Sequence, residues 1–166
     1  QDPENDAVLT TLTSTYSALG MQNKAEEIVN SALAKNPNSY GALVMMGQFA
    51  SQKKDYETAA NYLSKALEQA KDDNARIAIN ASIGQCWFYK AQERVAAVKG
   101  VLSPAARAQF NEVYNKAISY LETAKKLDTL KEQKSSWAYP LYGCYYFVKG
   151  AQAPETLAAA ADAGVQ

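Results

Sequence analysis

Apolar residues recur at spacings of three and four along most of the chain, which is the period of a helix with one buried face. In the first such run they are Val8, Leu9, Leu12, Tyr16 and Leu19. Gly20 ends this run, and a second one carrying the small residues Ala25 and Ala32 continues until Asn36 and Pro37 stop it. The pattern predicts two short helices joined by a tight turn, which together form a helical hairpin.

This hairpin pattern repeats after 34 residues. The segment Asp2–Asn5, with proline in second place, is echoed at Asn36–Ser39. Five apolar positions recur at the same distance: Leu9, Leu12, Tyr16, Ala25 and Ala32 return as Leu43, Met46, Ala50, Ala59 and Ala66. A repeat of this length is typical of stacked helical hairpins. We therefore expect an all-α chain that forms a single domain of four units, at about residues 6–39, 40–73, 74–131 and 132–166.

The third unit breaks the period. Gly84 and Ala117 are 33 residues apart, whereas the matching residues Gly47 and Ala59 of the second unit are 12 apart. The additional sequence stays helical, and Ser103-Pro104 is a typical helix start. It predicts a long hairpin, about residues 75–98 and 104–127, with arms of roughly 35 Å. Its additional apolar faces either pack only against each other, or present a tip, Val101 and Leu102, that contacts a partner or a second copy.

The fourth unit is rich in aromatic residues. Six of the eleven residues from Trp137 to Phe147 are aromatic, more than one face of a helix needs. Pro140 either falls near the first turn or kinks this helix, and residues 153–163 form a final alanine-rich helix. Two interpretations stay open. Either Tyr142 and Tyr146 belong to the core and the last helix covers the rest, or some aromatics form the floor of a peptide or glycan site. The floor would then consist of Phe88, Tyr89, Trp137 and Phe147.

The composition limits which partners and chemical activities we expect of the chain. The 17 basic residues balance the 17 acidic ones, which gives no reason to expect nucleic acid or an anionic membrane as partner. Histidine is absent, and Cys86 and Cys144 lack a metal-binding spacing, so they are either structural thiols or a disulfide. No catalytic motif is present, and we expect no enzyme activity, cofactor or membrane insertion. The localisation stays open: cytoplasmic, or periplasmic or secreted if a signal peptide was removed.

The second unit resembles a tetratricopeptide repeat. Its residues Leu43, Met46, Gly47, Ala59, Leu63 and Ala66 fill the pattern of that family, and the first unit matches with Thr13 in place of the glycine. The resemblance implies a right-handed α-α superhelix, a tetratricopeptide-like solenoid of about four helical hairpins, the third elongated, plus a C-terminal helix. Asp2-Pro3 lies where a loop between units falls, so the chain either is a fragment of a longer array, which we expect, or begins at a processing site.

In this family the first helices of successive units line a concave groove. Carried over by position, the groove residues that the resemblance implies are Gln48, Gln52, Gln85, Phe88, Tyr89, Trp137, Cys144 and Phe147. No lysine, arginine or asparagine occupies these positions, which argues against the capture of an acidic C-terminus. We therefore expect a non-catalytic interaction or scaffold module that binds a peptide or helical segment of a partner protein in the groove. The alternative is a small ligand, such as a glycan, at the aromatic end, and self-association is a further expectation.

Overall fold

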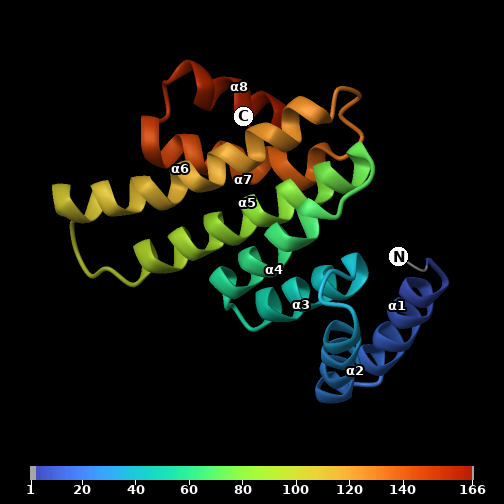
Figure 1. Cartoon of the computed structure of the whole chain (residues 1–166). Helices are drawn as coiled ribbons and strands as arrows, with labels where there is room; N and C mark the ends of the chain where they lie inside the picture. Colours follow the sequence, from blue (N-terminus) through green and yellow to red (C-terminus); the bar gives the residue numbers. More distant parts are fainter. Residues whose placement is uncertain (1–2, 166) are drawn as a thin grey trace. The chain divides into compact units, whose positions relative to one another are not determined.

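The structure is a computed structural model that describes residues 3–165, with side chains from residue 7 onward. Within this range it consists of helices and contains no strand, as the sequence predicts (Figure 1). None of these helices is long and apolar enough to cross a membrane. The chain divides into two compact units, Gln1–Ala70 and Lys71–Gln166. We call these two the first unit and the second unit of the structure, in place of the four repeat units expected from the sequence. The single domain with its four unit boundaries stays a prediction. Asp2, the start of the repeat echo, lies outside the described residues.

The first unit contains two hairpins. They are α1 (Pro3–Ala18) with α2 (Gln22–Lys35), and α3 (Tyr40–Gln52) with α4 (Tyr56–Glu68). The predicted stops are confirmed, because Gly20 adopts a φ of 72° in the first turn and α2 ends just before Asn36. Helix α3 packs onto α1 and α2 around a small core of Leu9, Ala25, Val29, Ala42, Met45 and Phe49.

Small residues allow the helices of a hairpin to cross closely. A Cβ atom placed on Gly47 would lie 2.7 Å from Cγ of Leu63 in α4, a distance at which one of the two must move. The matching position of the first hairpin is Thr13, which is only 4% exposed. Its hydroxyl has no hydrogen-bond partner among the described residues. The first hairpin therefore buries an unsatisfied polar atom where the second needs a glycine.

The second unit begins with the long hairpin. Helices α5 (Asp73–Ala96) and α6 (Pro104–Leu127) have 24 residues each, about 36 Å, which confirms the predicted elongation. The side chain of Ser103 accepts a hydrogen bond from the backbone N–H of Ala106, so the predicted cap is also confirmed. In Figure 1 the two helices run side by side and their connected ends extend beyond α7 (Lys134–Lys149) and α8 (Pro154–Ala163).

Two lysines hold α8 in place. The carboxylate of Asp162 lies 3.0 Å from Nζ of Lys125 in α6 and 2.6 Å from Nζ of Lys131 in the loop before α7. At the start of α8, the hydroxyl of Thr156 donates to the carbonyl of Gly150 at 2.8 Å. Both contacts fix a short helix that has only a small apolar face, where Thr156 and Ala159 are the buried residues.

The buried hydroxyl of Thr13 gives a first prediction. Thr13→Val replaces it with a methyl group of similar size and removes a buried polar atom that makes no hydrogen bond. We expect the free energy of unfolding of the first unit to rise by about 1 kcal/mol, measured by urea denaturation. Thr11→Val is the matched control in the same helix, because Thr11 is exposed and its hydroxyl donates to the carbonyl of Ala7. A loss of stability in Thr13→Val would show that the hydroxyl is satisfied in solution.

The Asp162 contact predicts a dependence on pH. Burial acts to raise the pKa of Asp162, but the hydrogen bonds and charges of Lys131 and Lys125 outweigh it and the pKa lies below its ordinary value. A lowered pKa in the folded state means that the contact stabilises the protein above the unfolded-state pKa, about 3.9, and that this contribution is lost as the pH falls through the folded-state pKa. We expect Asp162→Asn to reduce the free energy of unfolding at about pH 6, and the difference from the parent to shrink towards about pH 3. A difference that stays constant in urea titrations across this range would contradict the assignment.

Candidate interaction surface on helix α7

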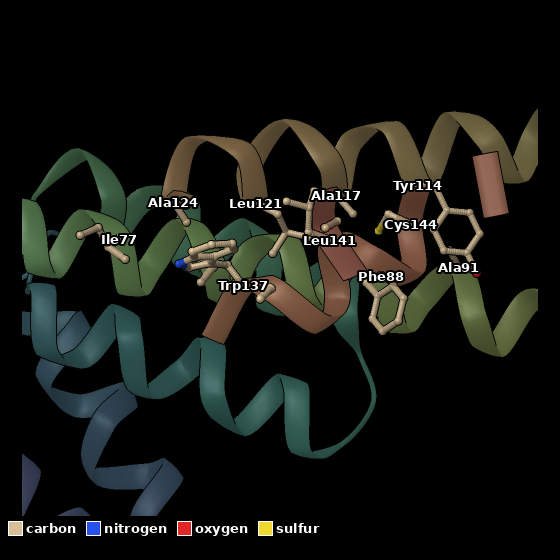
Figure 2. Packing of buried hydrophobic residues seen from close by; sticks show 13 residues of the cluster. Ile77, Phe88, Ala91, Tyr114, Ala117, Leu121, Ala124, Trp137, Leu141 and Cys144 are labelled. Carbon is tan, nitrogen blue, oxygen red and sulfur yellow. The ribbon is translucent and has the colours of Figure 1, made fainter. Parts of the chain in front are cut away.

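Helix α7 carries two apolar stripes on different faces. One consists of Trp137, Leu141 and Cys144, spaced by four and three residues and all 0% exposed. Figure 2 shows these three side chains among Tyr114, Ala117, Leu121 and Ala124 of α6. The other stripe consists of Tyr139, Tyr142 and Tyr146, spaced by three and four residues. The first stripe therefore forms the core of the second unit, and the second stripe is left for the surface.

The indole of Trp137 is fixed inside this core. Its Nε1 donates a hydrogen bond to Oδ2 of Asp128 at 2.8 Å, and the same oxygen accepts from the backbone N–H of Gln133 at 3.1 Å. Nζ of Lys125 lies 5.8 Å from the centre of the ring. Asp128 is itself buried, so its carboxylate keeps all of its hydrogen bonds only while the indole holds this position. The loop before α7 is thereby tied to the largest buried side chain of the unit.

Three of the residues expected to line a groove are instead core residues. Phe88 is 2% exposed and Trp137 and Cys144 are not exposed at all. The ring of Phe88 lies where a Cβ on Gly143 would be, with Cε2 only 2.6 Å from that position. This corrects the expectation, because Ala117, Leu121 and Ala124 of α6 pack on the face of α7 that carries Trp137 and Cys144 (Figure 2). The predicted floor of an aromatic site loses two of its four members, Phe88 and Trp137.

Both cysteines are buried thiols, and they form no disulfide. Burial raises the pKa of the Cys144 thiol well above its ordinary value. Burial also raises the pKa of Tyr114 to about 12, and the charge of a Cys144 thiolate would add to that effect. A protonated, buried thiol is a poor nucleophile and a poor metal ligand, so Cys144 has the properties of a small apolar core residue.

Two further predicted groove residues are held by contacts within the unit. The ring centre of Phe147 lies 4.5 Å from that of Tyr114, and the guanidinium of Arg107 lies 5.1 Å from the Phe147 ring centre. Arg107 also donates to the Phe147 carbonyl at 3.0 Å. Gln85 is half-buried and donates through Nε2 to the carbonyl of Ser136. Both side chains thus contact neighbouring helices of the second unit.

The remaining predicted residues lie apart along the chain, and all of them except Leu102 are exposed. Tyr89 on α5 is 42% exposed, and its ring centre lies 5.3 Å from that of Phe88. Gln48 and Gln52 are exposed on α3 of the first unit, where Gln52 accepts a hydrogen bond from Gln22 at 3.0 Å. At the tip of the long hairpin Val101 is 98% exposed, while Leu102 is half-buried.

The most continuous exposed aromatic feature is the second stripe of α7. Tyr139 is 58% and Tyr146 is 52% exposed, and the half-buried Tyr142 lies between them. The ring centres are 6.4 Å apart for Tyr139 and Tyr142, and 5.9 Å apart for Tyr142 and Tyr146. We call Tyr139, Tyr142 and Tyr146 the tyrosine surface. It spans eight residues of helix, and the rise from the first to the last is about 10.5 Å.

Sequence reasoning missed the tyrosine surface. Tyr139 was not among the expected site residues, and one interpretation placed Tyr146 in the core. A usable signal was present, because every aromatic of this stripe carries a hydroxyl, while the other stripe of α7 holds tryptophan, leucine and cysteine. A tyrosine hydroxyl needs water or a partner, so the stripe that is uniformly tyrosine is the one that faces solvent at least cost.

Comparison with known proteins agrees with the helical-hairpin architecture. Residues 23–83 match a family model described as tetratricopeptide repeat. A search of curated proteins gave no match. The matched segment runs from α2 to the middle of α5, and the glycine at the α3–α4 crossing lies within it. This match supports the tetratricopeptide repeat assignment, and residues 23–83 are the segment that carries it.

Proposed function

We propose that the chain is a non-catalytic interaction module and that its second unit binds a segment of a partner protein through the tyrosine surface. Tetratricopeptide repeats are in general protein–protein interaction modules. The observation that carries the finer proposal is the exposure of two tyrosines, Tyr139 and Tyr146, whose rings are linked through Tyr142.

Tyrosine suits such a role for physical reasons. It offers a large contact area with few rotatable bonds, so little conformational entropy is lost when it becomes ordered against a partner. Its ring provides apolar contact while its hydroxyl can still form a hydrogen bond at the edge of an interface. Three of them in one row provide a rigid strip that a helical or extended segment can follow.

The charges around the strip indicate what kind of segment fits. None of the three members of the tyrosine surface is charged, and Lys149, one turn beyond Tyr146, is paired with the carboxylate of Glu155. The tyrosine surface itself therefore offers a partner segment no charged group with which to form an ion pair. We infer that it is uncharged over the contacted stretch, with apolar or aromatic side chains facing the rings.

The proposal is tested with displayed peptides. A library of random twelve-residue peptides is selected against the whole chain, and the affinities of the selected peptides are measured by titration calorimetry. We expect Tyr139→Ala combined with Tyr146→Ala to weaken their binding at least about tenfold, because the loss of a central interface aromatic costs about 2 kcal/mol. Helicity should be unchanged, since both side chains are more than half exposed.

The matched control is located at the hairpin tip. Val101→Ser combined with Leu102→Ser also removes apolar surface, but at the predicted tip site. Peptides that lose affinity with the tip variant and not with the tyrosine variant would contradict the proposal and favour the tip. Binding of linear oligosaccharides to the tyrosine surface, with no peptide selected, would contradict it in favour of a glycan site.

A further inference from the structure

Pro140 lies in the interior of a helix. It is the seventh residue of α7, which continues from Lys134 to Lys149, and it is buried. Proline has no backbone N–H, so it makes no hydrogen bond to the carbonyl four residues earlier, which is that of Ser136. A carbonyl deprived of its helical donor has to find another partner or remain unsatisfied, which destabilises the folded state when the carbonyl is buried.

The missing donor comes from another helix. Nε2 of Gln85, in the middle of α5, donates a hydrogen bond to the carbonyl of Ser136. The two residues are 51 positions apart in sequence, so the bond is a tertiary contact. Among the amide atoms of a glutamine only the NH₂ group can donate, so this contact also determines how the side-chain amide is turned.

Two other contacts place the same pair of helices. Near the start of α5 the carbonyl of Asn74 accepts from Nε2 of Gln133, the residue before α7, at 3.3 Å. Further along, Phe88 of α5 packs onto Gly143 of α7. The hydrogen bond from Gln85 to Ser136 lies between these two contacts along α5. Of the three contacts, it is the one that uses the carbonyl left free by Pro140.

We propose that Pro140 and Gln85 form a positioning pair that fixes the register of α7 on α5 and thereby orients the tyrosine surface. Because of Pro140, the carbonyl of Ser136 is available as an acceptor on α7, and Gln85 supplies the donor for it. A shift of α7 by one turn leaves the Ser136 carbonyl without a donor. Tyr139 directly precedes Pro140, so the register of this turn also sets where the tyrosine surface begins. The role in orientation rests on the proposed function, whereas the pairing itself does not.

A double-mutant cycle tests the pairing without any ligand. Gln85→Met removes the donor and keeps the length of the side chain, and Pro140→Ala restores a backbone N–H that can donate to Ser136 within the helix. With Pro140 present, we expect Gln85→Met to increase the equilibrium constant for unfolding about tenfold. In the Pro140→Ala background, the same change should alter it less than about threefold. If Gln85→Met alone does not fold, the double variant should fold, because its second substitution supplies the donor.

Two measurements separate positioning from a general loss of packing. In ¹⁹F NMR of fluorotyrosine-labelled protein, the resonances of Tyr139, Tyr142 and Tyr146 should shift in Gln85→Met and return in the double variant. The control Gln92→Met, at an exposed glutamine of the same helix, should leave them unchanged. Equal costs of Gln85→Met in both backgrounds would overturn the pairing. A pairing that holds while Gln85→Met leaves the affinity for tyrosine-dependent peptides unchanged would overturn only its role in orienting the tyrosine surface.

Discussion

The close crossing of α5 and α6 is the constraint on which the second unit depends. A Cβ atom on Gly84 would lie 2.5 Å from Cγ of Leu121 and 3.2 Å from the carbonyl of Ala117, so only glycine permits this approach. Once the two backbones are this close, the small residues Ala117 and Ala124 leave a shallow face on α6 that α7 can cover. Packing at interior density then leaves little freedom, because a helix that fills this face must present side chains of matching shape. Trp137, Leu141 and Cys144 meet that demand.

The orientation of α7 follows from which of its two stripes is cheaper to bury. Turning the helix over would bury three phenolic hydroxyls and expose an indole, and each hydroxyl without a partner costs free energy. In the observed orientation the single polar atom of Trp137 is satisfied by Asp128, and Cys144 needs no partner. The Gln85 bond to the carbonyl that Pro140 leaves free adds a directional contact to this apolar preference. Burial therefore selects the face and hydrogen bonding selects the register.

The sequence was sufficient for the helices and insufficient for the surface. The three–four spacing, the cap at Ser103 and the stop at Asn36 are local signals, and they placed the long hairpin within a few residues. The expected site rests on positions in a regular repeat, and such positions hold only while the neighbouring helices keep their standard length. Helix α6 is longer, and its residues Arg107 and Tyr114 reach Phe147, which the repeat assigns to a groove. A tertiary contact of this kind cannot be predicted from the 34-residue repeat of the sequence.

Solvent exposure alone does not make the tyrosine surface functional, because burial of the other stripe forces these positions outward. The identity of the residues there carries the argument. On the outward side of α6 the exposed positions include Glu112, Lys116 and Lys126, the charged residues that an ordinary helix presents to water. Helix α7 could carry such residues without any change to its core, yet it presents Tyr139 and Tyr146. Exposed aromatics in a connected row are costly to hydrate and are enriched where proteins bind partners. The outward residues of α7 thus differ from those that packing and solubility require, and binding of a partner supplies a physical reason for the difference.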